Sequence, residues 1–224
     1  MITIVVPSFN EAQNVGHVVR DIAATFAHVA EKQVVVVDDG STDATAAVLR
    51  ALVAEFPFVK AVPHPRNMGL GVALQTGYAQ CREGVAAWLP ADGQFEARWI
   101  LAFHRTWERT RCAMVVGNVT ASNRKQSDGL FRLALSKGLR LMFFMSKRRP
   151  INFNGLMLFE RERLDMTRLK SVTGVVNFEI LEQFEAAGWR IEFENISVRP
   201  RLSGASKVTN LRTSWASFMD LLRK

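Results

Sequence analysis

Blocks of apolar and polar residues alternate regularly along the first half of the chain. Short runs rich in valine and isoleucine are followed by longer segments whose apolar residues recur at helical spacing. The expected strands are 2–6, 33–38, 58–62, 85–89 and 113–117, and the expected helices are about 11–29, 44–55, 69–81 and 97–108. Uniformly apolar runs are typical of parallel strands that are buried on both faces. The pattern predicts an α/β fold with a doubly wound, mostly parallel sheet and helices on both faces.

The second half is less regular. Residues 130–145 are strongly apolar but interspersed with cations, and Pro150 must stop or bend this segment. The remaining expected elements are a strand at 151–159, a helix at 177–187, short strands at 190–193 and 196–198, and an amphipathic helix at 213–223. We therefore divide the chain into a first half at 1–120, a second half at 121–210 and a C-terminal amphipathic helix at 211–224.

Composition argues against a secreted miniprotein, an integral membrane protein and a fibrous chain. The chain has 224 residues, of which 48% are hydrophobic, so it can bury a sizeable core. Its two cysteines cannot build a disulfide framework or a four-cysteine zinc site, which favours a reduced cytoplasmic compartment. No window of about 18 apolar residues is present, so we expect no membrane-spanning helix. The N-terminus turns polar after Pro7, too early for a secretory signal.

The net charge of +8 is unevenly distributed. Residues 124–149 hold eight basic residues against Asp128, and residues 199–224 hold six against Asp220. Such clusters favour an anionic partner, with phosphates, anionic lipid headgroups and nucleic acid as the candidates. Nucleic acid is not expected, because no RNA-binding motif is recognisable. A solvated basic surface is the alternative interpretation.

Candidate chemistry lies just after the expected strands, where open α/β sheets bind their ligands. A carboxylate at Asp39 can accept hydrogen bonds from a nucleobase or a ribose. Asp92 and the amide of Gln94 offer hard oxygen ligands for Mg²⁺ or Mn²⁺. The alternative is that an aspartate after a strand only caps the next helix, which we expect for Asp43.

Other motifs are absent. The Gly69-Leu70-Gly71 loop lacks the spacing of a dinucleotide-binding fingerprint, and no phosphate-binding P-loop is present. The four histidines have no metal-ligand spacing, and we interpret them as structural or surface residues. They are His17, His28, His64 and His104.

Four motifs occur in the order and at the separations of a known family. They are VVPSFNEAQNV, VVVVDDGSTD, RNMGLGVALQTGY and LPADGQF. On these motifs the chain resembles glycosyltransferase family 2, which has the GT-A fold. Residues 201–207 fit an R-x-x-G-x-S-K pattern, and Arg132 and Ser136 lie four apart on an expected helix. These features resemble the polyprenyl-phosphate branch, that of the dolichyl-phosphate mannosyltransferases.

The resemblance implies a GT-A-type sheet that carries the nucleotide-sugar site at 1–120. The acceptor side lies at 121–210, before the terminal amphipathic helix. The donor-binding residues are Pro7, Phe9, Glu11, Asp39, Pro90, Ala91, Asp92 and Lys207. Asp92 and Gln94 would hold Mg²⁺ or Mn²⁺. The acceptor phosphate would contact Arg132, Ser136 and Arg201, and the residues expected to be catalytic are Asp92, Arg132 and Arg201.

The chain departs from the family pattern at three places. Phe9 stands where tyrosine is common, and Pro90 replaces the first aspartate of an Asp-x-Asp motif. An arginine that often follows the fifth strand is missing from Gly117-Asn118-Val119, and Arg124 or Lys125 is expected to compensate.

The implied reaction is an inverting transfer. A lipid phosphate oxygen attacks the anomeric carbon of a GDP- or UDP-linked sugar, and the nucleoside diphosphate leaves. A phosphate monoester has its second pKa near roughly 6, so the acceptor needs little help from a base. An interfacial helix at 130–145 and the terminal helix would place the protein on the cytoplasmic face of a membrane, as a peripheral protein. A separate membrane subunit remains open.

Two alternatives remain open. The chain could transfer sugar to a saccharide or protein hydroxyl, which needs a carboxylate base, and Glu179 is then the candidate. It could also bind a nucleotide sugar without turnover, since Pro90 weakens the metal motif. Residues 130–145 could equally be an ordinary core helix with basic ends.

Overall fold

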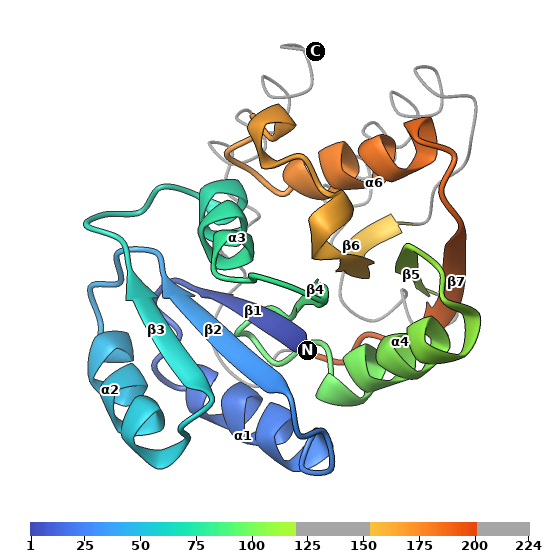
Figure 1. Ribbon diagram of the computed structural model, residues 1–224. Helices are drawn as coiled ribbons and strands as arrows, with labels where there is room; N and C mark the ends of the chain where they lie inside the picture. Colours follow the sequence, from blue (N-terminus) through green and yellow to red (C-terminus); the bar gives the residue numbers. More distant parts are fainter. Residues whose placement is uncertain (120–152, 201–224) are drawn as a thin grey trace.

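The structure, a computed structural model, describes residues 1–119 and 153–200 of the chain. Within them, seven strands form one sheet in the order β3-β2-β1-β4-β6-β5-β7 (Figure 1). The strands are β1 (Ile2–Ser8), β2 (Lys32–Asp38), β3 (Val59–Pro63), β4 (Val85–Trp88), β5 (Met114–Val119), β6 (Phe153–Glu160) and β7 (Ile191–Ile196). All neighbouring strands pair in parallel except where β6 pairs with β4 and β5.

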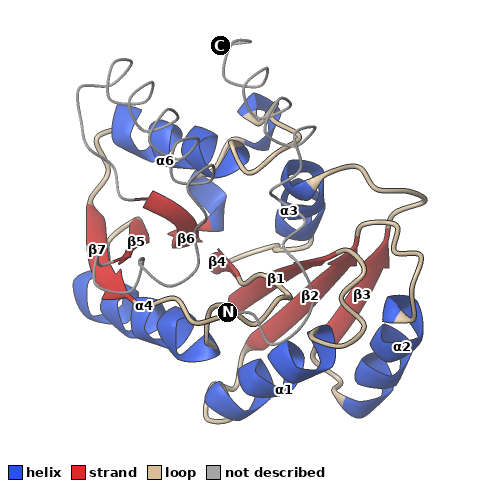
Figure 2. Cartoon of the chain, turned by 180° about the vertical axis from the view of Figure 1, so that it is seen from behind, coloured by secondary structure: helices blue, strands red, loops and turns tan. Residues whose placement is uncertain are grey.

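Helices cover both faces of this sheet (Figure 2). They are α1 (Val15–Thr25), α2 (Thr45–Glu55), α3 (Leu70–Ala79), α4 (Ala97–Thr110) and α6 (Val176–Ala186). Buried residues of α1, α2 and α4 belong to one apolar cluster, and those of α3 and α6 to the other. The expected α/β architecture, a mostly parallel sheet between two helical layers, is confirmed.

The valine-rich runs supply both apolar clusters at once. Side chains alternate across a strand, so consecutive residues of β1 and β2 point to opposite faces of the sheet. One cluster contains Ile4, Val6, Val34 and Val36, and the other contains Val5, Val35 and Val37, all of them fully buried. This two-sided burial is the physical reason for the uninterrupted apolar sequence of these strands.

Several expected boundaries are wrong, and the first helix is wrong at both ends, because it stops at Thr25 rather than near residue 29. The first helix begins at Val15 rather than near residue 11, because the chain first forms a loop in which the N–H groups of Asn14 and Val15 donate to the carbonyl of Glu11. The two short strands expected at 190–193 and 196–198 are one continuous strand, β7, whose whole length pairs with β5.

The strand expected at 151–159 is present as β6, but its place was not predictable from the apolar pattern. It inserts antiparallel between β4 and β5, with Ala87 opposite Leu158 and Val115 opposite the same residue from the other side. The 3-10 turns η2 (Arg161–Arg163) and η3 (Met166–Arg168) follow it and lead to α6.

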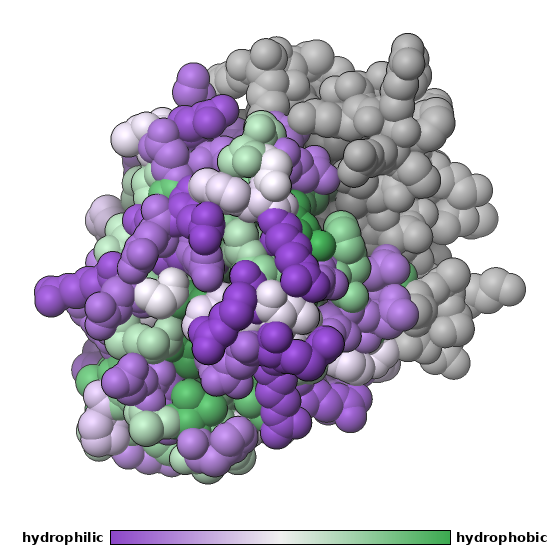
Figure 3. All heavy atoms as spheres, turned by 45° about the vertical axis from the view of Figure 1, so that its right-hand side comes forward, coloured by the Kyte–Doolittle hydropathy of each residue, from purple (hydrophilic) through white to green (hydrophobic). Residues whose placement is uncertain are grey.

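The expected interfacial helix at 130–145 and the terminal helix at 213–223 lie outside the described residues. Among the residues that are described, no helix is both long enough and apolar enough to cross a membrane. On the face shown in Figure 3, hydrophilic residues dominate the described surface and apolar residues form separate patches between them.

Candidate functional site

The loops that carry the predicted site residues follow three adjacent strands of the sheet. β1 lies between β2 and β4, and Ser8, the last residue of β1, is opposite Asp38, the last residue of β2. All three strands run parallel. Their carboxyl ends therefore lie at one edge, and the loops at 9–14, 39–44 and 89–96 start from it.

The first two loops are tied together by side-chain hydrogen bonds. Asn10 has a positive φ of 52°, its N–H donates to Ser41 Oγ, and its Oδ1 accepts from the N–H of Thr42 at 2.7 Å. The N–H of Glu11 donates to Thr45 Oγ1 at 2.9 Å. The loop after β1 therefore has a defined shape before any ligand binds.

Glu11 is one of the predicted donor-binding residues, and its side chain is buried. Its Oε2 accepts from the side-chain amide of Asn14 at 2.6 Å, and only 8% of the residue is exposed. Phe9, in the same loop, and Pro7, near the end of β1, are half-buried. Their expected role in nucleotide binding stays a prediction.

Asp39 closes a third loop onto this edge. Its Oδ1 accepts from the N–H of Met68 at 2.8 Å, and its Oδ2 accepts from the N–H of Gly69 at 2.9 Å. Its Oδ1 also lies 2.8 Å from Nδ1 of His64. The carboxylate, expected to accept hydrogen bonds from a nucleoside, thus already holds the turn that begins α3. An oxygen such as Oδ2, with one partner within 1–119 and 153–200, has room for a second donor.

His64 is the residue that the sequence interpretation undervalued. Its side chain is 8% exposed, with Nδ1 on Asp39 and Nε2 3.0 Å from Thr76 Oγ1 on α3. It is structural, as expected, but it acts within the candidate site. No spacing rule marks it, and only its place just before the Arg66–Gly71 motif could have drawn attention to it.

The loop after β4 presents the predicted metal ligands. Asp92 is 8% exposed, and its Oδ1 accepts from the N–H of Gln94 at 3.0 Å across Gly93, which has a φ of 71°. Gln94 is half-buried. Pro90 is half-buried as well, whereas Ala91 is 2% exposed and packs in the core, so it can meet a ligand only through its backbone.

The chain beyond β7 is hydrogen-bonded across this loop. The N–H of Arg199 donates to the carbonyl of Gln94 at 3.0 Å, and its Nε donates to the carbonyl of Gly93 at 3.3 Å. Its guanidinium also lies 3.2 Å from Glu96. Arg199 therefore connects the Asp92 loop to the segment that leads, two residues later, to Arg201.

The residues of the Asp92 loop fit a small divalent cation by their chemistry. A carboxylate and an amide supply hard oxygen donors, and Mg²⁺ is usually held by one or two carboxylates together with substrate phosphates. Over 1–119 and 153–200, no group of three or more histidine, cysteine, aspartate or glutamate side chains is placed to hold a metal ion.

Glu179, the base of the alternative reaction, lies on α6 and is 7% exposed. Its Oε2 accepts from the N–H groups of Lys170 and Ser171, and its Oε1 accepts from Ser171 Oγ at 2.8 Å. The N-cap residue of α2 is Ala44 rather than Asp43, but the Asp43 carboxylate accepts from the N–H of Thr45, the first residue of the helix, and also from the N–H of Ala12.

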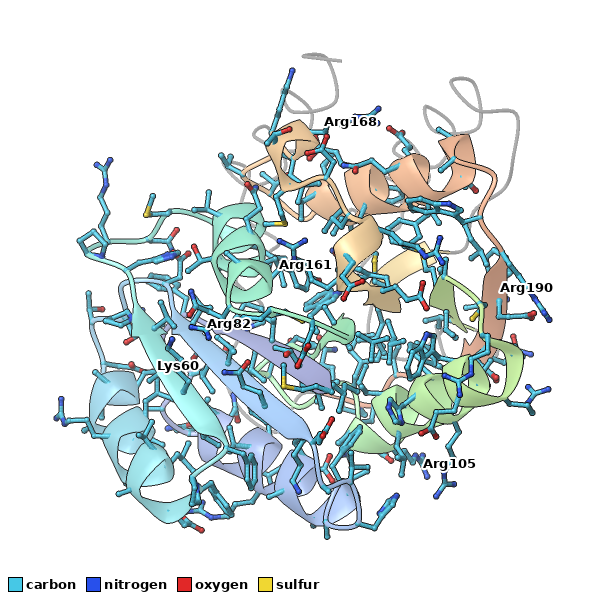
Figure 4. All side chains as sticks on the ribbon, viewed as in Figure 1. Lys60, Arg82, Arg105, Arg161, Arg168 and Arg190 are labelled. Atoms are coloured by element: carbon cyan, nitrogen blue, oxygen red, sulfur yellow. The ribbon has the colours of Figure 1, made fainter. Side chains whose placement is uncertain are left out.

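The remaining predicted site residues lie outside the described residues. They are Arg132, Ser136, Arg201 and Lys207, together with the compensating candidates Arg124 and Lys125. The basic side chains labelled in Figure 4 come from separate elements, for example Lys60 on β3, Arg105 on α4 and Arg190 before β7. The two basic clusters of the sequence, 124–149 and 199–224, fall in the undescribed segments, apart from Arg199.

Comparison with known proteins gives a family match and several relatives. The model of the family "Glycosyl transferase family 2" matches residues 3–165. A dodecaprenyl-phosphate galacturonate synthase from Rhizobium johnstonii is 36% identical over 132 residues, which are 58% of this chain and 38% of the relative. A dolichyl-phosphate beta-glucosyltransferase from Trichomonas vaginalis is 29% identical over 74% of this chain and 54% of the relative. The chain thus spans about half or less of the length of these relatives.

Solved structures agree on the fold. Glucosyl-3-phosphoglycerate synthase from Mycobacterium tuberculosis, in complex with Mn²⁺, UDP-glucose and phosphoglyceric acid, matches with a TM-score of 0.73 at 18% identity, over 100% of this chain and 79% of that one. Mannosyl-3-phosphoglycerate synthase from Rubrobacter xylanophilus matches with a TM-score of 0.72 at 18% identity, over 100% of this chain and 73% of that one. The expected GT-A-type fold class is confirmed by these likenesses.

Proposed function

Because the chain belongs to glycosyl transferase family 2, we propose that it is an inverting glycosyltransferase that moves a sugar from a nucleoside-diphosphate sugar to a polyprenyl phosphate. The observation that carries the proposal is the loop after β4. It combines the buried carboxylate of Asp92, the amide of Gln94 and the hydrogen-bonded segment around Arg199. The loop thus offers oxygen ligands for a metal ion and has the basic side chain of Arg199 beside it, and the binding of a diphosphate requires both kinds of group.

In this proposal the first half, 1–120, binds the donor. Pro7, Phe9 and Glu11 form one wall of the nucleotide site, and Asp39 accepts a hydrogen bond from the nucleoside through its less occupied Oδ2. Pro90 and Ala91 position the backbone before Asp92. The nucleoside is guanosine or uridine, both of which offer donors to a carboxylate.

Asp92 and Gln94 would hold Mg²⁺ or Mn²⁺ at the diphosphate. The ion, when bound, neutralises charge that develops on the leaving diphosphate. Manganese is the first ion to test, since glucosyl-3-phosphoglycerate synthase from Mycobacterium tuberculosis was solved with Mn²⁺.

The second half, 121–210, would bind the acceptor phosphate. Arg132, Ser136 and Arg201 contact it, while Lys207 lies on the donor diphosphate. A bidentate arginine matches the geometry of a phosphate, and cations placed beforehand offset the repulsion between two phosphate groups. Relatives named for dodecaprenyl and dolichyl phosphates support this acceptor class. We further propose that the protein binds peripherally at the cytoplasmic face of a membrane, with or without a separate membrane subunit.

The test is transfer of radiolabelled sugar from a panel of UDP- and GDP-sugars to a short-chain polyprenyl phosphate, with Mn²⁺ or Mg²⁺. We expect a lipid-linked product whose formation stops when the metal is chelated. Asp92→Asn should lower kcat by at least about a hundredfold, the scale on which loss of a preorganised electrostatic group acts. Glu83→Gln, an exposed site at the opposite end of β4 from the loop, is the control.

Two results would contradict the proposal. Transfer to a saccharide or protein hydroxyl but not to the lipid phosphate would assign the alternative acceptor. Nucleotide binding without any product, in the wild type and in Asp92→Asn alike, would assign a binding protein.

A further inference from the structure

A short segment at 170–172 is held from one side by α6. Glu179 Oε2 accepts from the N–H of Lys170 at 3.0 Å and from that of Ser171 at 3.2 Å, and its Oε1 accepts from Ser171 Oγ at 2.8 Å. Ser171 is 2% exposed, so these bonds are made away from bulk water. Hydrogen bonds to a charged group are stronger than neutral ones, and they are more so where water is excluded.

The same segment is held from its other side by α3. The carbonyl of Ser171 accepts from the side-chain amide of Gln75 at 3.1 Å, and the carbonyl of Val172 accepts from the N–H of Gly71 at 2.9 Å. A Cβ atom at position 71 would lie 2.3 Å from the carbonyl oxygen of Ser171. The two backbones therefore approach so closely that only glycine fits at position 71.

The start of α3 is also the turn that Asp39 holds. Gly69 precedes α3 with a φ of 99°, its N–H donates to Asp39, and a Cβ atom there would lie 2.5 Å from the carbonyl oxygen of Val172. One turn of backbone thus has the Asp39 carboxylate on one side and the segment at 170–172 on the other. A shift of this segment must move the turn against which Asp39 closes.

We propose that Glu179 is a positioning residue of the donor site, which acts through the segment at 170–172 and the turn at 68–71 on Asp39. This inference rests on the proposed function, because it takes the Asp39 loop to be part of the donor site. It assigns Glu179 a role other than that of a general base: both of its oxygens already accept hydrogen bonds within the protein.

Glutamine and alanine at position 179 separate the two roles. The amide of Glu179→Gln can preserve the arrangement, since its oxygen can accept from Lys170 and Ser171 and its N–H can donate to Ser171 Oγ. Positioning therefore predicts near wild-type kcat and an unchanged kcat–pH profile for this variant. Loss of a general base predicts a fall in kcat of roughly a hundredfold or more.

Glu179→Ala removes all three acceptor contacts. We expect it to weaken binding of UDP or GDP, measured by titration calorimetry with Mn²⁺, by roughly tenfold, as follows when one strong hydrogen bond no longer orders the site. In assays the donor KM should rise more than kcat falls. Glu185→Ala, an exposed glutamate on the same helix, is the matched control.

Ser171→Ala provides a milder second variant should Glu179→Ala not fold, since it removes only the hydroxyl contact. It should weaken nucleotide binding in the same direction by a few fold, as the loss of one hydrogen bond does. Unchanged nucleotide affinity in the folded variants would overturn the inference, and so would a collapse of kcat in Glu179→Gln at unchanged affinity.

The binding measurement needs no acceptor, so the two hypotheses fail separately. A wild-type protein that binds nucleotide but glycosylates no lipid phosphate would contradict the proposed function and leave the positioning role measurable. A wild-type protein that binds neither UDP nor GDP would overturn both.

Discussion

At the scale of single residues, buried carboxylates determine the shape of two loops of this molecule. Asp39 and Glu179 are both carboxylates with less than a tenth of their surface exposed, and both accept several hydrogen bonds from backbone N–H groups. Such bonds compensate the cost of removing a charge from water. In both cases the carboxylate shapes a loop by accepting hydrogen bonds from its backbone N–H groups.

Another buried titratable residue makes stability depend on pH. Burial on α4 lowers the pKa of His104 below its ordinary value of 6.5, and the nearby carboxylate of Glu108 opposes the shift only in part. The unfolded chain therefore takes up a proton at a higher pH than the folded protein does. Stability from this group is present above pH 6.5 and is lost as the pH falls through the lowered pKa.

We predict that His104→Gln reduces the loss of melting temperature between about pH 7 and pH 5, a window set by the ordinary histidine pKa. Thermal melts over this range compare the variant with the wild type. His17→Gln, at an exposed position, is the control and should leave the pH dependence unchanged. The same change of melting temperature with pH in the wild type and in His104→Gln would contradict the assignment.

At the scale of elements, the contact between α3 and the sheet depends on a glycine. Gly77 lies in the helix opposite Val5 of β1, and a Cβ atom there would come within 2.2 Å of Val5 Cγ1. Alanine is ordinarily the better helix former, by about 1 kcal/mol. Overpacking in a dense core costs more, typically about 1–3 kcal/mol, so the steric effect decides the sign.

Gly77→Ala should therefore lower the free energy of unfolding by about 1–2 kcal/mol, measured by urea denaturation. Gly16→Ala is the matched control, because it lies in α1 and its nearest neighbour at 3.2 Å is the flexible end of Arg20. That change should be neutral or slightly stabilising. Adding Val5→Ala to Gly77→Ala should restore part of the loss, and equal effects of the two glycine changes would contradict the packing argument.

At the scale of the whole molecule, most of the excess basic charge lies in segments other than those that form the described sheet and helices. The described residues form the sheet, its two helical layers and the strand-end loops, whereas most of the one-sided basic sequence falls in 124–149 and 199–224. A basic, apolar surface segment binds anionic membranes through buried apolar area and attraction to headgroups. We expect the membrane contact to be separable from the donor-binding half.

Removal of residues 213–224 should weaken co-sedimentation with vesicles that contain anionic lipid, and added salt should reduce the difference, since charge contributes to the binding. Turnover with a short-chain acceptor in solution should change little. Arg105→Ala, an exposed cation on α4, should affect neither measurement. Loss of turnover together with membrane binding would instead indicate that the terminal segment supports folding.

The elements and the positions of the motifs could be predicted from the sequence alone. Burial on one or both faces leaves a local period in the residues themselves, and for that reason the strands and helices of the first half were found with small errors at their ends. The residues after β1, β2 and β4 were singled out for the same reason, because parallel strands bring their carboxyl ends to one edge.

Only the tertiary structure decided which groups meet. The insertion of β6 between β4 and β5 and the closure of Asp39 onto Gly69 depend on the path of the chain. So do the contact of His64 with Thr76 and the hold of Glu179 on Ser171. A local pattern records how deeply a side chain is buried, but the partner of a buried polar group can lie dozens of residues away. That partner is set by packing, which no short stretch of sequence contains.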